Sequence, residues 1–475
     1  MMRKKLYIDG NWNSTESYTE LFSPYSNEKI GEIPKSTVED VEFAINVAEK
    51  TRSEMENLTA YERAHILEQL VVLFTENKEK AAEIISLESA KPLKYALGEI
   101  ERTIETYKFA AEEAKRLTGE MIPMDAAKGG ANRLGYTIRQ PLGVIAAITP
   151  FNFPQNLVAH KVGPAIAAGN TIVLKPASQT PLSAFFLAEL LDQTDLPKGA
   201  FNLVTGSGRV IGDVLVENEK VKMVTFTGSP AVGKGIRDKA GLKKVTLELG
   251  SNAGLIIDEG VNIDAIVEKT VTGAFSNQGQ VCISLQRIYV MENLLEEFLS
   301  KFKDAAEKLV IGNPMDKKTD VSAMISKEEQ ERAASWVQEA LSDGAELIVG
   351  GSAKDGVFQP TILSNVSSLA KISCQEVFAP VVIVNSIQTI EEGIKEINDS
   401  NYGLQAGIFT TDINTAFKAS KQLEVGGVLI NDIPTFRVDQ MPYGGVKDSG
   451  TGKEGLSYAI EEMTEMKLVI WNHED

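Results

Sequence analysis

The sequence predicts an α/β protein with a doubly wound parallel sheet and a second α/β unit. From residue 142 onward, short apolar runs rich in β-branched residues alternate with runs of helical periodicity. A second stretch of the same kind follows Asn252. Strands separated by helices form parallel sheets, and a chain of 475 residues is long enough for two or three domains.

The first part of the chain predicts a covering layer of helices. Between residues 36 and 118, apolar side chains recur at helical spacing, with a second such run over 61–75. The first run is marked by Val38, Val41, Ala44, Ile45 and Ala48.

The next part predicts the first sheet. Strands are expected over 142–149, 171–175, 201–204, 223–227 and 245–249, with helices over 155–168, 181–191, 209–217 and 231–239. Ligands of doubly wound sheets bind beyond the carboxyl ends of the strands. This rule places Thr149, Lys175, Gly206 and Gly228 beside one pocket.

After Asn252, strands are expected over 287–291, 348–349, 381–384 and 427–430, with helices over 295–309 and 327–342. Two β-rich pieces, around Ile138 and over 466–471, have no obvious home sheet. Unpaired strands often join another copy of the same chain, so we expect a homo-oligomer.

Composition excludes several partners. The net charge of −18 repels nucleic acids and anionic membrane surfaces. No apolar run approaches the ~18 residues of a membrane span. Two cysteines, Cys282 and Cys374, cannot build a disulfide framework, and the N-terminus lacks a secretory pattern, so we expect a cytoplasmic protein. Three histidines without ligand spacing predict no metal site.

A glycine-rich segment at 228–235 is close to the phosphate loop of nucleotide hydrolases. That loop needs Ser or Thr where this chain has Gly235, which argues against ATP hydrolysis. A helix beginning after Gly228 still suits the pyrophosphate of a dinucleotide. The segment Gly206-Ser207-Gly208 matches the GxGxxG fingerprint only in part.

Cys282 and Glu248 suggest covalent chemistry. A thiolate attacks a carbonyl carbon, and a carboxylate can later activate water against the resulting thioester. A single cysteine is more often a small buried apolar residue, so the pair alone leaves both interpretations open.

Seven short motifs, taken together and in order, resemble the NAD(P)-dependent aldehyde dehydrogenase superfamily over residues 5–471. They are Thr149-Pro150-Phe151-Asn152-Phe153-Pro154, Lys175-Pro176-Ala177-Ser178, Phe226-Thr227-Gly228-Ser229, Glu248-Leu249-Gly250, Gly279-Gln280-Val281-Cys282, Glu376-Val377-Phe378-Ala379-Pro380 and Pro442-Tyr443-Gly444-Gly445. The resemblance implies a dinucleotide-binding domain over 1–120 and 142–248 and a catalytic domain over 249–455. It also implies a β-rich oligomerisation arm over 121–141 and 456–475, in a homodimer or homotetramer.

The resemblance also implies catalytic roles. Cys282 would attack the aldehyde, and the side-chain amide of Asn152 with the backbone N–H of Cys282 would hold the oxyanion. Glu248 would activate the water that hydrolyses the thioester, which favours a free acid as product.

For the cofactor, NAD or NADP, the resemblance places Lys175 at the adenine-side ribose, Gly228 and Ser229 at the pyrophosphate, and Glu376 with Phe378 at the nicotinamide-side ribose. Ser178 replaces a glutamate common in NAD-strict members, so NADP is expected to be tolerated. The remaining expected cofactor residues are Thr149, Pro150, Phe151, Ala177, Gly208, Phe226, Thr227, Val232 and Leu249.

For the substrate, the resemblance implies a tunnel lined by the helix after Phe153, with Asn152, Gln155 and His160 as polar contacts. These residues favour a small hydroxylated or anionic aldehyde, as in the lactaldehyde, sulfolactaldehyde and non-phosphorylating glyceraldehyde-3-phosphate dehydrogenases. Arg437 would clamp an anion there or form a loop salt bridge, for example with Asp439.

Several alternatives stay open. Succinic semialdehyde enzymes tend to carry arginines at the positions of His160 and Ser276, yet a semialdehyde or broad-specificity enzyme is the second interpretation. A silent structural or nucleotide-binding member is the third. Lys161 would cap the pocket or relay protons, and Cys374 is expected to be a packed thiol.

Overall fold

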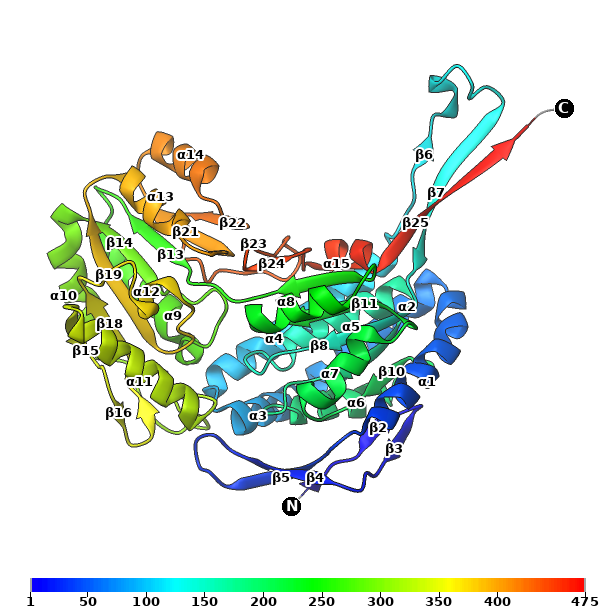
Figure 1. Ribbon diagram of the computed structural model, residues 1–475, viewed down its shortest axis with the longest axis horizontal. Helices are drawn as coiled ribbons and strands as arrows, with labels where there is room; N and C mark the ends of the chain where they lie inside the picture. Colours follow the sequence, from blue (N-terminus) through cyan, green and yellow to red (C-terminus); the bar gives the residue numbers. More distant parts are fainter. Residues whose placement is uncertain (1, 474–475) are drawn as a thin grey trace.

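A computed structural model describes residues 2–473. Its two large sheets are each covered by helices, and a narrow three-stranded arm projects from the first (Figure 1). The predicted α/β class is therefore confirmed. The first residue of the expected dinucleotide-binding domain and the last two of the expected arm lie outside the described residues.

The first sheet has eight strands in the order β24-β12-β11-β8-β9-β10-β2-β3. Its five central strands are parallel, and each lies where a strand was expected. They are β8 (Val144–Ile148), β9 (Thr171–Lys175), β10 (Phe201–Leu203), β11 (Val221–Thr227) and β12 (Lys244–Glu248). The strand order reverses beside β8, which is where doubly wound sheets bind ligands.

Antiparallel strands that were not expected complete both edges of this sheet. They are β2 (Leu6–Ile8), β3 (Asn11–Asn13) and β24 (Gly450–Thr451). Because β24 pairs with β12, it brings residues near the end of the chain beside Glu248. A separate three-stranded sheet contains β1 (Met2–Arg3), β4 (Tyr18–Phe22) and β5 (Lys29–Pro34).

Helices cover both faces of the first sheet, because successive side chains of a strand point to opposite faces. In β8, Ile145 and Ala147 join one core, while Val144 and Ala146 join the other. The first core is covered by α2 (Ala60–Glu76), α3 (Lys78–Ser89), α4 (Leu93–Ala114), α5 (Asn156–Ala168), α6 (Leu182–Leu191) and α15 (Leu456–Glu462). The second is covered by α1 (Val38–Asn57), α7 (Gly208–Glu217) and α8 (Pro230–Lys239).

The second sheet has seven strands in the order β15-β18-β19-β14-β13-β21-β22 and is parallel except for β15. The strands are β13 (Gly254–Ile257), β14 (Arg287–Met291), β15 (Glu346–Val349), β18 (Thr361–Ser364), β19 (Val381–Ile387), β21 (Gln405–Phe409) and β22 (Gly427–Ile430). Its helices are α9 (Ile263–Phe275), α10 (Leu295–Ala306), α11 (Lys327–Ser342), α12 (Lys371–Cys374), α13 (Ile390–Asn398) and α14 (Ile413–Gln422).

Short elements lie elsewhere along the chain. They are β16 (Ala353–Lys354), β17 (Val357–Phe358), β20 (Tyr402–Gly403) and β23 (Val446–Lys447), with 3-10 turns η1 (Met124–Ala126), η2 (Ser276–Gly279) and η3 (Glu292–Leu294).

The projecting arm contains β6 (Met121–Ile122), β7 (Arg133–Pro141) and β25 (Thr464–Asn472) (Figure 1). The two β-rich segments that could not be assigned to a sheet from the sequence thus pair with each other, as β7 and β25. The strand order of the arm is β25-β7-β6. This leaves one edge of β25 without a partner strand within residues 2–473. The domain boundaries and the oligomer stay predictions. Among these residues, no helix is long and apolar enough to cross a membrane.

Candidate active site

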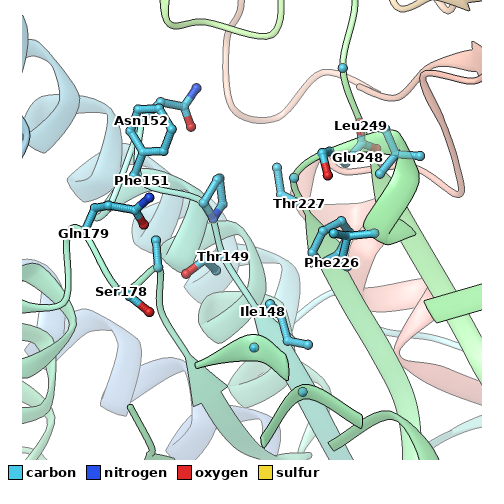
Figure 2. Close-up of a pocket in the computed structure, with 18 of the residues that line it drawn as sticks. Ile148, Thr149, Phe151, Asn152, Ser178, Gln179, Phe226, Thr227, Glu248 and Leu249 are labelled. Carbon is cyan, nitrogen blue, oxygen red and sulfur yellow. The ribbon is translucent and has the colours of Figure 1, made fainter. Parts of the chain in front are cut away.

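A cavity of about 1100 Å³ lies at the carboxyl ends of β8, β9, β11 and β12 and extends to the second sheet. Every residue expected to bind the dinucleotide lines it, together with Cys282, Glu248 and Asn152. Asn152 and Phe151 lie on one side of this cavity, and Thr227 and Glu248 lie on the other (Figure 2). Gly206 lines a neighbouring cavity instead.

The loop that carries Cys282 follows α9 through a strained turn. Asn277 and Gln278 have φ angles of 50° and 55°, in the left-handed region. A Cβ at Gly279 would lie 2.0 Å from the carbonyl oxygen of Ala379, so only glycine fits there. The side-chain amide of Gln278 donates to the carbonyl oxygens of Ala90 and Ala323 at 3.0 and 2.8 Å. These constraints fix the backbone just before Cys282.

The Cys282 side chain is half-buried, and its Sγ lies 2.8 Å from the hydroxyl oxygen of Tyr443. Burial raises the pKa of the Cys282 thiol to about 11, against the opposing influence of Tyr443 and of the Arg437 charge. A thiol with a raised pKa is a weak nucleophile until its surroundings change. The reactive form therefore depends on the groups that touch the sulfur.

Asn152 lies in the loop between β8 and α5 and is buried. Its side-chain amide nitrogen donates to the carbonyl oxygen of Gln280 at 2.9 Å. Asn277 donates to the same carbonyl oxygen at 3.2 Å. The loops of Asn152 and Cys282 are thus held together although they are far apart in the sequence.

Glu248 ends β12 and is buried, and neither carboxylate oxygen has a hydrogen-bond partner among the described residues. Burial, with the nearby charge of Glu454, raises the pKa of Glu248 well above its usual range. Gly444 has a φ of +157°, and a Cβ there would lie 2.8 Å from Glu248 Oε1. The carboxyl group therefore has room only because residue 444 lacks a side chain.

The part of the cavity expected to hold the nicotinamide-side ribose contains Glu376 and Phe378. Glu376 accepts a hydrogen bond from the backbone N–H of Ser251 at 2.9 Å, and burial raises its pKa to about 7. A Cβ at Gly250 would lie 2.5 Å from Glu376 Oε2, so glycine makes room for the carboxyl group. The Phe378 ring packs edge-on against Phe151, with centroids 5.8 Å apart.

The part expected to hold the adenine-side ribose contains Lys175 and Ser178. Burial lowers the pKa of Lys175 to about 8, and its ammonium donates to the carbonyl oxygen of Pro176 at 3.1 Å. Ser178 is exposed and donates to the carbonyl oxygen of Gly206 at 3.3 Å.

The donor set of the cavity fits a dinucleotide. Thr149 and Thr227 each bury a hydroxyl that has no partner among residues 2–473, and both line the cavity. Such groups are available to a bound polar molecule. Within the same residues, no group of three or more His, Cys, Asp or Glu side chains is placed to hold a metal ion.

The structure places the other expected substrate residues away from this cavity. The Gln155 amide is buried and donates to the carbonyl oxygen of Ser183 at 2.7 Å. His160 Nε2 lies 2.9 Å from Asp439 Oδ1 and 3.1 Å from Arg437 Nη2. The expected loop salt bridge of Arg437 forms with Glu454, at 3.0 Å, whereas Asp439 pairs with Arg102 and His160.

Sequence reasoning missed a buried network of charges behind the cysteine. Lys161 donates to Glu454 and to the hydroxyl of Thr225, each at 3.1 Å. Burial acts to raise the pKa of Glu454, but the charges of Lys161 and Arg437 outweigh it and hold that pKa at about 2. No spacing in the sequence marks Glu454 as their partner. Cys374, in contrast, makes only a weak contact with the carbonyl oxygen of Leu369, at 3.7 Å.

The match to known proteins covers nearly the whole chain. Residues 12–469 match the aldehyde dehydrogenase family, and the chain belongs to this family. It is 47% identical over 467 residues to 3-sulfolactaldehyde dehydrogenase of Priestia aryabhattai, and the match covers 98% of each chain. It is 42% identical over 473 residues to lactaldehyde dehydrogenase of Methanococcus aeolicus, covering 98% of this chain and 100% of the relative.

Solved structures agree with this assignment. Aldehyde dehydrogenase 21 from Physcomitrella patens, in complex with the reaction product succinate, has a TM-score of 0.97 at 39% identity, over 99% of this chain and 98% of that one. Glyceraldehyde-3-phosphate dehydrogenase GapN from Methanocaldococcus jannaschii, complexed with NADP, has a TM-score of 0.93 at 42% identity, over 96% and 100%.

Proposed function

We propose that this chain oxidises small 2-hydroxyaldehydes to carboxylic acids with NAD or NADP, using Cys282 as nucleophile, Asn152 as oxyanion donor and Glu248 as base. The observation that carries the catalytic assignment is that these three side chains line the same cavity as the complete expected set of dinucleotide residues. A nucleophile, a donor and a base at one cavity are the parts that acyl chemistry needs.

In the proposed reaction, Cys282 loses its proton and its sulfur bonds to the carbonyl carbon, while the carbonyl electrons move to the oxygen. The Asn152 amide and the Cys282 N–H hold that oxygen, and losing one such donor costs about 3 kcal/mol in the barrier. NAD(P)⁺, when bound, would supply the acceptor for the hydride of the tetrahedral adduct. As the hydride leaves, the oxyanion electrons re-form the C=O bond and give a thioester on Cys282. Glu248 then takes a proton from water as the water attacks the thioester, which releases the acid and restores the thiol.

The substrate class is inferred from what the relatives' substrates share. Lactaldehyde, 3-sulfolactaldehyde and glyceraldehyde-3-phosphate each carry a hydroxyl beside the aldehyde and differ in the third carbon. The positive charge of Arg437 is close enough to lower the pKa of the Cys282 thiol. The Nε of Arg437 is buried without a hydrogen-bond partner among the described residues. Arg437 does not line the cavity, but its positive charge near Cys282 favours a polar or anionic aldehyde.

A semialdehyde is the second candidate. The succinate bound in aldehyde dehydrogenase 21 is the acid that a four-carbon semialdehyde yields. Succinic semialdehyde has an anionic tail but no 2-hydroxyl, so it separates the two substrate classes.

The test compares four aldehydes, each with NAD and with NADP: 3-sulfolactaldehyde, lactaldehyde, succinic semialdehyde and propanal. We expect kcat/KM for both 2-hydroxyaldehydes to exceed that for propanal by at least about tenfold, because an unpaired site donor costs more than 1.4 kcal/mol. Preference for succinic semialdehyde would replace the first candidate by the second. Cys282→Ala serves as the inactive control.

The cofactor is proposed to be NAD or NADP. Exposed Ser178 presents no carboxylate to a 2′-phosphate, and GapN was solved with NADP. Trp336 lines the cavity, so quenching of its fluorescence gives a binding constant for each cofactor that does not depend on turnover.

We also propose a cytoplasmic homodimer or homotetramer. The two free cysteines support the compartment. The unpaired edge of β25, with apolar side chains exposed, supports the assembly.

A further inference from the structure

We propose that Tyr443 is a catalytic residue whose hydroxyl donates a hydrogen bond to the sulfur of Cys282 and stabilises its thiolate form. The inference rests on the proposed role of Cys282 as nucleophile and deepens it. It adds a side chain that touches the reacting atom itself.

The first observation is the contact and its rigidity. The Tyr443 hydroxyl oxygen lies 2.8 Å from Cys282 Sγ, and the tyrosine is buried. Its backbone exchanges two hydrogen bonds with Glu454, at 3.0 and 2.6 Å. The ring also packs with Val281, Ile283 and Leu404. The hydroxyl is therefore held at the sulfur by the fold.

The second observation is a cation on the tyrosine ring. The guanidinium carbon of Arg437 lies 3.7 Å from the centroid of the Tyr443 ring, and Arg437 is itself held by Glu454 and His160. A cation on a phenol ring draws electron density from it, which makes the O–H a better donor. Arg437 is thus a positioning residue that acts through Tyr443.

The third observation is the balance of groups that face the sulfur. Burial and the carboxyl groups of Glu376 and Glu248 disfavour a negative sulfur, and the charge of Arg437 favours it. Hydrogen bonds to a charged form stabilise that form, so the Tyr443 O–H adds to the favourable side.

The direction of the hydrogen bond follows from acidity. Burial and the neighbouring Cys282 hold the pKa of Tyr443 well above its usual range. The phenol therefore keeps its proton while the thiol ionises. The proton shared between the two atoms then belongs to oxygen, and the sulfur is the acceptor.

The test is Tyr443→Phe, which keeps the ring over Arg437 and removes only the hydroxyl. The rate of Cys282 alkylation by iodoacetamide is measured against pH in the cofactor-free protein, in a Cys374→Ser background that leaves one thiol. We expect the rate profile to move to higher pH by about 0.5–1 unit, because a hydrogen bond to a charged group is lost while intrinsic nucleophilicity rises.

The matched control is Tyr458→Phe, at an exposed tyrosine of α15, whose profile should match that of the parent protein. A Tyr443→Phe profile that overlays the parent profile overturns the proposal. If the variant does not fold, 3-fluorotyrosine at position 443 supplies a more acidic hydroxyl and should move the profile to lower pH; a profile that does not move overturns the proposal equally.

Turnover gives a second readout. With the best aldehyde, Tyr443→Phe should lower kcat several-fold and leave KM within about twofold, because the bond acts on the nucleophile and not on substrate binding. Alkylation needs no aldehyde, so the profile shift tests Tyr443 even if the proposed substrate class is wrong.

Discussion

Cys282, the proposed nucleophile, lies in an environment that disfavours its reactive thiolate form. Burial disfavours its thiolate, and the strained turn before it removes conformational freedom. Strain and shifted pKa values gather at functional sites because the surrounding fold holds them in place. At the scale of single residues, the segment around Cys282 therefore contains a strained backbone and a buried thiol, and both features cost folding stability.

Glu248 supports a residue-scale prediction. Glu248→Gln cannot accept a proton, so the acyl-enzyme should accumulate and appear in mass spectra as the parent mass plus one acyl group. Steady turnover should fall about 10²–10⁴-fold. Because the pKa of Glu248 is raised, hydrolysis in the parent enzyme should quicken as pH rises through that pKa.

The control for this experiment is the Cys282→Ala, Glu248→Gln double variant, which should show no added mass. Rapid turnover by Glu248→Gln without an adduct would exclude Glu248 as the base.

At this scale, the residues that were named from local motifs lie together in the structure. The motif residues assigned to the dinucleotide line one cavity with Cys282, because each follows a strand of the same sheet or faces that sheet. Glu454 and Tyr443 were not assigned individual roles, and Asp439 was named only as a possible partner of Arg437. Their contacts with Lys161, Cys282 and Asn156 join residues more than 100 positions apart in the sequence, and no local pattern encodes such pairs.

At the scale of elements, two helices next to the active site are capped by acids from elsewhere in the chain. Neither α5 nor α6 has a side-chain cap of its own. Glu99 accepts hydrogen bonds from the backbone of Gln155 and Asn156 at 2.9 and 3.2 Å, at the start of α5. Glu88 accepts them from Leu182 and Ser183 at 2.6 and 3.0 Å, at the start of α6. Acidic side chains satisfy the free N–H groups there.

Glu88 leads to a prediction on stability. Burial raises the pKa of Glu88 in the folded protein to about 8, well above the ordinary value of 4.5 for a glutamate. As pH rises, Glu88 therefore loses its proton in the unfolded chain before it does so in the folded protein. The contribution of Glu88 to the stability of the folded protein is fully present below about pH 4.5 and is lost as pH rises to about 8. Glu88→Gln cannot ionise, so its Tm should fall less steeply than that of the parent protein between pH 5 and 8.

The comparison uses thermal melts at several pH values, with Glu83→Gln as control, because Glu83 is an exposed acid on the same helix. Parallel curves for Glu88→Gln and the parent protein would contradict the assignment.

The prediction of elements from the sequence was most accurate in the first sheet. All five of its central strands were predicted, and the bounds of β9 agree with expectation at both ends. In the second sheet, the bounds of β14 and β22 agree as well. The strands β13, β18 and β21 were not predicted. Each has four or five residues that are buried on both faces, and periodicity does not distinguish so short a buried run from part of a helix. The strands β9 and β14 have the same burial pattern, so burial alone does not decide which short strands are recognised.

At the scale of the whole molecule, the arm leaves an apolar edge exposed. Met466, Leu468, Ile470 and Trp471 of β25 are each about half exposed. Unpaired apolar edges of this kind pair with other chains.

The edge supports a prediction on assembly. Leu468→Lys should lower the molar mass measured by size-exclusion chromatography with light scattering, because a buried lysine at a strand edge opposes pairing. Leu242→Lys, at a fully exposed leucine in a loop, should not change that mass. An unchanged mass for Leu468→Lys would show that β25 is not the site of assembly.

The pairing of β24 with β12 has a consequence for biosynthesis. The ribosome releases Asn152 and Cys282 long before Tyr443 and Glu454, and β24 joins the first sheet only after 450 residues have emerged. The growing polypeptide therefore carries its sulfur without the neighbours that tune it. Cys282 can therefore gain its contact with Tyr443, and Glu248 its neighbour Gly450, only when translation is almost complete.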